Sequence, residues 1–112
     1  MDMKCLSIKQ PYADLIVSSK KSIELRTRNT KFRGEFLIHA SKKIDKEACD
    51  MSNIDSDSLI IGPILGKAIL YDVKIYKNKN SFVLDRNKHL AATKYTDHKY
   101  GFLIKNGHQA NP

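Results

Sequence analysis

The sequence contains little cysteine and no long hydrophobic run, and both absences narrow what the protein can be. Its two cysteines, Cys5 and Cys49, lie far apart, outside any C-x-x-C motif and with no histidine at metal-ligand spacing. This pattern predicts neither a disulfide framework nor a zinc site. The most apolar stretch, residues 59–65, is broken by a Gly-Pro pair and is too short to span a bilayer. Residues 1–9 lack an apolar signal core, so we expect a cytoplasmic protein with no membrane partner.

Acidic residues are scarce relative to basic ones. The chain has 20 Lys and Arg against 12 Asp and Glu, which gives a net charge of +8 at pH 7. Residues 1–34 carry a net charge of +5, residues 35–62 of −3 and residues 63–112 of +6. If the fold brings the two basic segments together, they form one face suited to a polyanion such as nucleic acid. An ordinary solvated basic surface explains the charge equally well.

Length and patterning predict one small domain over residues 1–112. The hydrophobic content of 41% supplies enough apolar side chains for a single core at this size. We expect a fold of the α+β class, mainly β, because a curled sheet or barrel removes exposed sheet edges. The pattern predicts strands at residues 3–8, 22–28, 32–40, 65–76 and 100–105, and helices at residues 12–17 and 44–51. Residues 77–81 resemble a polar loop, the last strand leads into Asn106-Gly107, and residues 82–98 are ambiguous, with one helical turn at 88–92 as an option.

The strand at residues 22–28 alternates strictly, and its polar face holds the densest chemistry in the chain. Lys21 stands just before the strand, and Glu24 and Arg26 are two positions apart on one face. All three side chains can point into one cleft, where a neighbouring cation holds the glutamate ionised. The alternative is an exposed ion-pair network that adds little stability.

These residues also carry a family resemblance. Residues 6–13 (LSIKQPYA), 21–26 (KSIELR) and 32–41 (FRGEFLIHAS) strongly resemble the ASCH family, named for activating signal cointegrator homology, in the PUA-like superfamily. The family hallmark, G-x-K-x-x-E-x-R, is present with Ser19 at the glycine position and with Lys21, Glu24 and Arg26 in place. The resemblance implies a small β-barrel related to RNA-binding PUA domains, with a cleft beside the helix that receives the hallmark side chains.

The resemblance also raises a question about the end of the barrel. Family members usually carry one more strand after a proline at the position of Pro112. Without that strand, residues 100–105 would present unpaired backbone groups along one side. We therefore expect either a partly open barrel or a seam covered by a partner chain, with a dimer as one option. Pairing with the strand at residues 3–8 would close the seam within the chain.

The first functional hypothesis is a nucleic-acid-binding module, with RNA favoured over DNA. Glu24 and Arg26 would form the floor of a pocket, because glutamate accepts from an exocyclic amine and arginine matches phosphate or a guanine edge. The phosphate contacts would come from the surrounding basic residues: Lys20, Lys21, Arg28, Lys31 and Arg33.

The second hypothesis is an enzyme of the same fold, either a ribonuclease or an N4-acetylcytidine amidohydrolase. Lys21 would act as nucleophile or base and Glu24 would move the proton. A bacterial branch that the chain resembles has this hydrolase activity, but it carries threonine in place of Glu24 and a later catalytic glutamate. Residues 82–112 contain no glutamate. The third hypothesis is a protein-interaction module of a transcription or translation complex.

Other candidate residues have plainer interpretations. His39 and Ser41 share a strand face but lack an acidic partner, so a structural histidine is favoured over a nucleophile pair. His89 and His98 have no carboxylate cluster, so we predict no metal and no cofactor. Three aromatic residues are candidates for stacking on bases, with core packing as the alternative: Tyr12, Phe32 and Tyr95.

Overall fold

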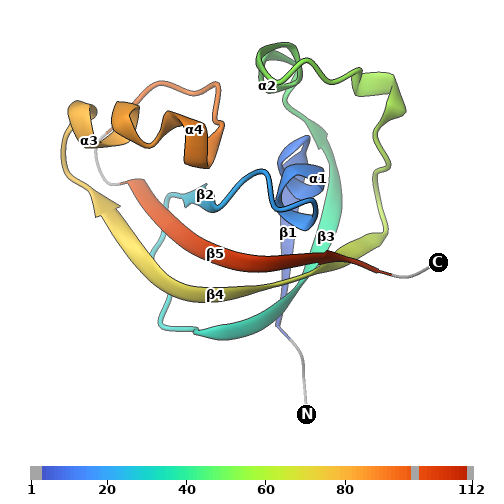
Figure 1. Ribbon diagram of the computed structural model, residues 1–112, viewed down its shortest axis with the longest axis horizontal. Helices are drawn as coiled ribbons and strands as arrows, with labels where there is room; N and C mark the ends of the chain where they lie inside the picture. Colours follow the sequence, from blue (N-terminus) through green and yellow to red (C-terminus); the bar gives the residue numbers. More distant parts are fainter. Residues whose placement is uncertain (1–3, 97–98, 111–112) are drawn as a thin grey trace.

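Strand order defines the architecture of the protein (Figure 1). The computed structural model describes residues 4–96 and 99–110, so the predictions for Met3, His98 and Pro112 lie outside the described residues. In these residues one five-stranded sheet has the order β1-β3-β4-β5-β2, with β1 and β3 parallel and the other pairs antiparallel. The strands are β1 (Lys4–Gln10), β2 (Ile23–Arg26), β3 (Gly34–Ile44), β4 (Ile64–Tyr76) and β5 (Lys99–Gln109). The α-helices are α1 (Tyr12–Val17), α2 (Lys46–Met51), α3 (Lys79–Leu84) and α4 (Arg86–His89), and a 3-10 turn covers Ser56–Ser58.

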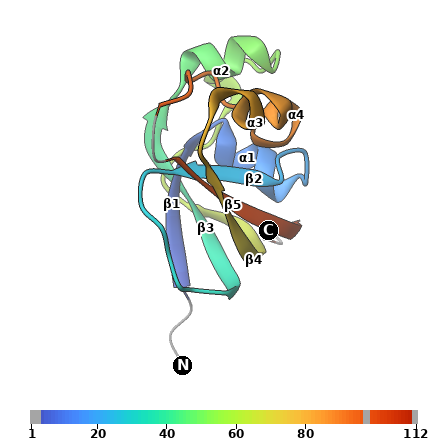
Figure 2. The same cartoon turned by 90° about the vertical axis from the view of Figure 1, so that its left-hand side faces the viewer.

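The sheet curls around α1, which lies on its concave face. Ala13, Ile16 and Val17 occupy one side of this helix, at helical spacing, and all three are buried. They pack against inward-facing residues of β1, β3, β4 and β5, among them Phe36 and Phe102. Figure 2 shows α2, α3 and α4 gathered at one end of the sheet, away from the start of β1. No helix in the described part of the chain has the length and apolar character needed to cross a membrane.

The two edge strands, β1 and β2, leave the curled sheet open between them. The side chain of Arg26 bridges this gap, because its Nη2 donates a hydrogen bond of 3.0 Å to the carbonyl oxygen of Ser7. The structure is therefore a half-barrel of the α+β class, which confirms the predicted fold class. The expectation that the barrel is partly open is also met, and we call the gap between β1 and β2 the seam.

The predicted position of the open edge was wrong. Residues 100–103 pair with β2 on one side, and β5 also pairs with β4 on the other, so this segment has neighbours along both sides. The short strand β2 takes the place expected to be empty. In addition, β5 continues through Asn106-Gly107 to Gln109, beyond the predicted end at residue 105. A Cβ atom at Gly107 would collide with the carbonyl oxygen of Ile16, so the glycine lets β5 run close to the end of α1.

The helix count also differs from the two helices predicted. Residues 79–89, interpreted partly as a polar loop, form α3 and α4. The side chain of Asn78 accepts a hydrogen bond of 2.9 Å from the backbone N–H of Ser81 and caps α3. A polar residue that looks like part of a loop is therefore the start signal of a helix.

Ser19 explains why the hallmark prefers glycine at this position. The chain leaves α1 by a tight turn in which the N–H groups of Lys20 and Lys21 both donate to the carbonyl oxygen of Leu15, at 2.9 Å each. Ser19 adopts a φ of 63°, in the left-handed region that strains a residue with a Cβ atom. This turn places Lys21 at the start of β2.

We predict that Ser19→Gly raises the free energy of unfolding by about 0.5–1 kcal/mol, because it relieves the left-handed strain. Denaturant unfolding measures the change. The matched control is Ser18→Gly, because Ser18 has an ordinary φ of −87° and should lose stability on the same exchange. A Ser19→Gly variant less stable than the parent protein would contradict the argument.

Candidate nucleic-acid interface

A cavity of about 590 Å³ is lined by residues of both edge strands at the end of the sheet where the helices gather. The segment leading into α2 borders it on one side and the connection from α4 to β5 on the other (Figure 1). Six basic and two acidic side chains line it. We call Tyr12, Lys21, Glu24 and Arg26 its floor.

The floor contains a buried ion-pair network built on Glu24. One carboxylate oxygen, Oε1, lies 3.5 Å from Lys21 Nζ, and the other, Oε2, lies 3.5 Å from Arg26 Nε. The side chains of Lys21 and Glu24 are 1% and 9% exposed. The interpretation as an exposed, weak ion-pair network therefore does not apply. The buried carboxylate therefore lies between two cations, one beside each of its oxygens.

Lys21 is surrounded on several sides. Its Nζ donates a hydrogen bond to the carbonyl oxygen of His89 and lies 4.6 Å from the centroid of the Tyr12 ring. Burial lowers the pKa of the Lys21 amine below its ordinary value, and the carboxylate of Glu24 acts in the opposite direction. The amine thus joins α1, β2 and α4 at one point.

Tyr12 connects the two sides of the cavity. Its hydroxyl donates a hydrogen bond of 2.8 Å to Asp45 Oδ2 and accepts one of 3.4 Å from the N–H of Ala92. Asp45 also caps α2, because its Oδ1 accepts from the N–H of Ala48 at 3.0 Å. Burial and the bond to Asp45 raise the pKa of Tyr12. The Tyr12 side chain is therefore a fixed wall of the cavity, with the Lys21 amine over its ring.

Four lysines surround the floor, and we call them the lysine rim: Lys9 of β1, Lys42 and Lys43 of β3, and Lys99 of β5. Among the described residues, none of the four forms an ion pair with a carboxylate. None of the four is among the site residues predicted from the sequence. The available signal was the Lys-Lys pair at 42–43, directly after the third stretch that resembles the family.

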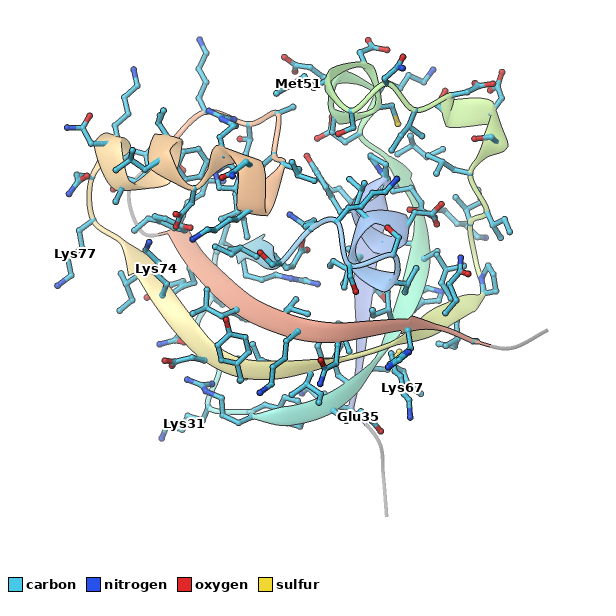
Figure 3. The ribbon with its side chains drawn as sticks, viewed as in Figure 1. Lys31, Glu35, Met51, Lys67, Lys74 and Lys77 are labelled. Atoms are coloured by element: carbon cyan, nitrogen blue, oxygen red, sulfur yellow. The ribbon has the colours of Figure 1, made fainter. Side chains whose placement is uncertain are left out.

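The other basic residues predicted to bind phosphate lie elsewhere. Lys20 is exposed in the turn after α1, outside the cavity. Lys31 lies at the end of the sheet opposite α2 and α4 (Figure 3). Arg33 Nη2 lies 3.7 Å from Asp72 Oδ1, and Arg33 Nη1 donates to two carbonyl oxygens of its own loop. Arg28 lines a second, smaller cavity along the seam.

The remaining candidates have structural contacts. His39 Nδ1 lies 2.8 Å from Ser7 Oγ, its cross-strand neighbour on β1. Phe32 packs against the core, and the hydroxyl of Tyr95 donates to the carbonyl oxygen of Tyr76 at 3.1 Å. Across residues 4–96 and 99–110, no three His, Cys, Asp or Glu side chains gather closely enough to hold a metal ion.

His89 holds the helical side of the cavity in place. Its side chain is fully buried, with Nε2 2.9 Å from the carbonyl oxygen of Phe82 and Nδ1 accepting 3.0 Å from the N–H of Ala91. These partners require a neutral ring with its proton on Nε2. Burial lowers the pKa of His89 to about 4.

We predict that the stability of the protein falls by about 3 kcal/mol as the pH drops from 6.5 to 4, because unfolded His89 takes up a proton that the folded ring resists. Above pH 6.5 this contribution is fully present. His89→Gln should flatten the dependence in that window, as measured by urea unfolding at several pH values. Phe82→Leu is the control, since it weakens the same packing but leaves the titrating ring. An unchanged slope in His89→Gln would contradict the assignment.

Comparison with known proteins places this geometry in a family. Three solved structures of ZmASCH from Zymomonas mobilis share the fold at 16% sequence identity. A tyrosine-to-phenylalanine mutant has a TM-score of 0.68 over 96% of this chain and 72% of that chain. A serine-to-alanine mutant and a further structure of ASCH have TM-scores of 0.66 and 0.64, each over 94% of this chain and 68% of that chain. No curated protein matches the chain.

The family assignment rests on the sequence. The model of the ASCH domain family matches residues 6–106. This range includes the whole floor of the cavity and all four lysines of the rim. The chain therefore belongs to the ASCH domain family, as the resemblance of its hallmark residues predicted.

Proposed function

We propose that the protein binds single-stranded nucleic acid, RNA in preference to DNA, with one unpaired base in the cavity. The observation that carries this proposal is the lysine rim: four cations from three strands surround a cavity and, within the described residues, form no ion pairs with carboxylates. A lysine that is paired with a carboxylate of the protein has its charge already neutralised. The four rim lysines lack such a partner and are available to bind phosphates.

The floor supports recognition of a base. A cavity of about 590 Å³ lies within the size range of small-ligand sites and has room for one nucleotide. The Glu24 carboxylate accepts hydrogen bonds and the Arg26 guanidinium donates them, so the floor can pair with the edge of an unpaired base that has an exocyclic amine. Proteins read RNA sequence mainly through such unstacked bases. The relation of the fold to RNA-binding PUA domains favours RNA over DNA.

We predict that the double variant Lys42→Ala, Lys43→Ala weakens binding of single-stranded RNA and flattens its salt dependence. Each lost phosphate contact should remove about 0.7 from the slope of log affinity against log salt. Fluorescence anisotropy with a labelled single-stranded RNA at several salt concentrations measures both quantities.

The matched control is Lys77→Ala, Lys79→Ala, which removes the same charge from exposed residues that do not line the cavity. Its slope should stay close to that of the parent protein. Equal losses in the two double variants would assign the binding to net charge. No RNA binding by the parent protein at about 50 mM salt would overturn the proposal.

A hydrolase acting on RNA or a modified nucleoside is the second candidate function. One observation favours it: burial lowers the pKa of the Lys21 amine on the cavity floor, which increases the fraction of free base. The neighbouring Glu24 carboxylate, 3.5 Å away, opposes this by stabilising the ammonium form.

Turnover of N4-acetylcytidine and of labelled RNA tests this candidate. If the protein is such an enzyme, Lys21→Met should abolish product formation, because it removes the only amine on the floor of the cavity. The control Lys20→Met changes an exposed neighbour and should retain activity. Binding without turnover would reject the hydrolase and leave the binding function in place.

A further inference from the structure

We propose that a second nucleotide subsite lies beside the cavity, across Arg26, so that the bound strand runs along the seam between β1 and β2. This inference rests on the proposed function and deepens it, because it states where the neighbouring nucleotide goes. The starting observation is a second cavity of about 260 Å³ that shares Arg26 and Thr27 with the first.

The two cavities follow the same edge of the sheet. Ser7 and Lys9 of β1 line the first cavity, whereas Lys4 and Leu6 of the same strand line the second. From Lys9 to Lys4 the strand covers about 16 Å. These two pairs of side chains alternate between the faces of β1, so each cavity meets the strand at a different face, and the cavities join at Arg26 and Thr27, which line both.

Arg26 forms the wall between the two subsites. Its Nη2 is fixed by the hydrogen bond to the carbonyl oxygen of Ser7, and its Nε lies 3.5 Å from Glu24 Oε2. The guanidinium is thus held across the seam at the point where a strand would pass from one cavity to the next. A planar cation in this position is suited to the phosphate that links two nucleotides.

The second cavity has the chemistry of a nucleotide subsite. Half-buried Leu6 provides apolar surface for a base, and Phe102, a core residue, also lines the cavity. Lys4 and Arg28 are exposed basic residues on its border, and within the described residues neither forms an ion pair. Asn29 Oδ1 accepts from the N–H of Thr30 at 2.7 Å, which directs its amide nitrogen as a donor. The subsite thus assigns a role to Arg28, which the first cavity does not use.

The length of the bound strand provides the test. Adenosine monophosphate occupies one subsite, whereas a hexanucleotide of adenosine occupies both. Arg28→Ala should lower the affinity for the hexanucleotide at least about threefold and leave the affinity for the monophosphate unchanged. Binding is measured by NMR titration for the monophosphate and by anisotropy for the hexanucleotide. Lys4→Ala, on the opposite border of the same cavity, should give the same pattern.

Lys31→Ala is the matched control, because Lys31 is an exposed cation of the same connection that lines neither cavity. If Arg28→Ala and Lys31→Ala weaken the hexanucleotide equally, the second subsite does not exist. A loss of monophosphate affinity in Arg28→Ala would also overturn it, by assigning Arg28 to the first cavity.

If the parent protein binds the monophosphate and Arg28→Ala has no effect on the hexanucleotide, the proposed function stands and the subsite fails. If the parent protein binds neither probe, the proposed function itself fails.

Discussion

The buried contact between Lys21 and Glu24 is the constraint on which the candidate site depends. The lysine amine reaches the carbonyl oxygen of His89 in α4 and the ring of Tyr12 in α1, and the glutamate belongs to β2. Lys21 and Glu24 are both buried and lie 3.5 Å apart, and removing one partner of such a buried pair costs roughly 3–5 kcal/mol. The pair therefore fixes three elements relative to one another and places a charged floor where a hydrophobic core would otherwise continue.

Arg26 extends this network to the sheet edges. It contacts Glu24 through Nε and the Ser7 carbonyl through Nη2, so one side chain joins the ion pair to the opposite edge strand. A closed barrel would satisfy these edges with backbone hydrogen bonds. Here the seam stays open and polar groups face it, which gives the same residues a structural and a ligand-facing role.

The sides of the cavity are held by hydrogen bonds of two uncharged side chains, Tyr12 and His89. Tyr12 binds Asp45 on one side and Ala92 on the other, and neutral His89 ties α4 to Phe82 and Ala91. The lysine rim lies outside this network: Lys9, Lys42 and Lys43 are exposed and Lys99 is half-buried, whereas Lys21 and Glu24 of the floor are buried. The buried charged side chains of the floor are paired within the protein, because an unpaired buried charge is costly. The exposed lysines of the rim are available to bind a polyanion.

The sequence by itself indicated three of the four floor residues, Lys21, Glu24 and Arg26, and most of the strands. The strict alternation around Glu24 and Arg26, with Lys21 just before them, predicted one charged face, and the long β-branched segment at residues 65–76 predicted β4 to within one residue. Alternation of this kind involves only residues close together in the chain, so the sequence is enough to predict the strand and its polar face.

Only the tertiary structure decided which cations surround the floor and where the sheet is open. Lys9, Lys42, Lys43 and Lys99 meet because β1 lies parallel to β3 and because β5 begins beside β2. The insertion of β2 next to β5 moved the open edge away from residues 100–105. The pairing of strands that are distant in the chain depends on which of their apolar faces can be buried together. A single sequence indicates the apolar face of each strand but not which strand lies next to it.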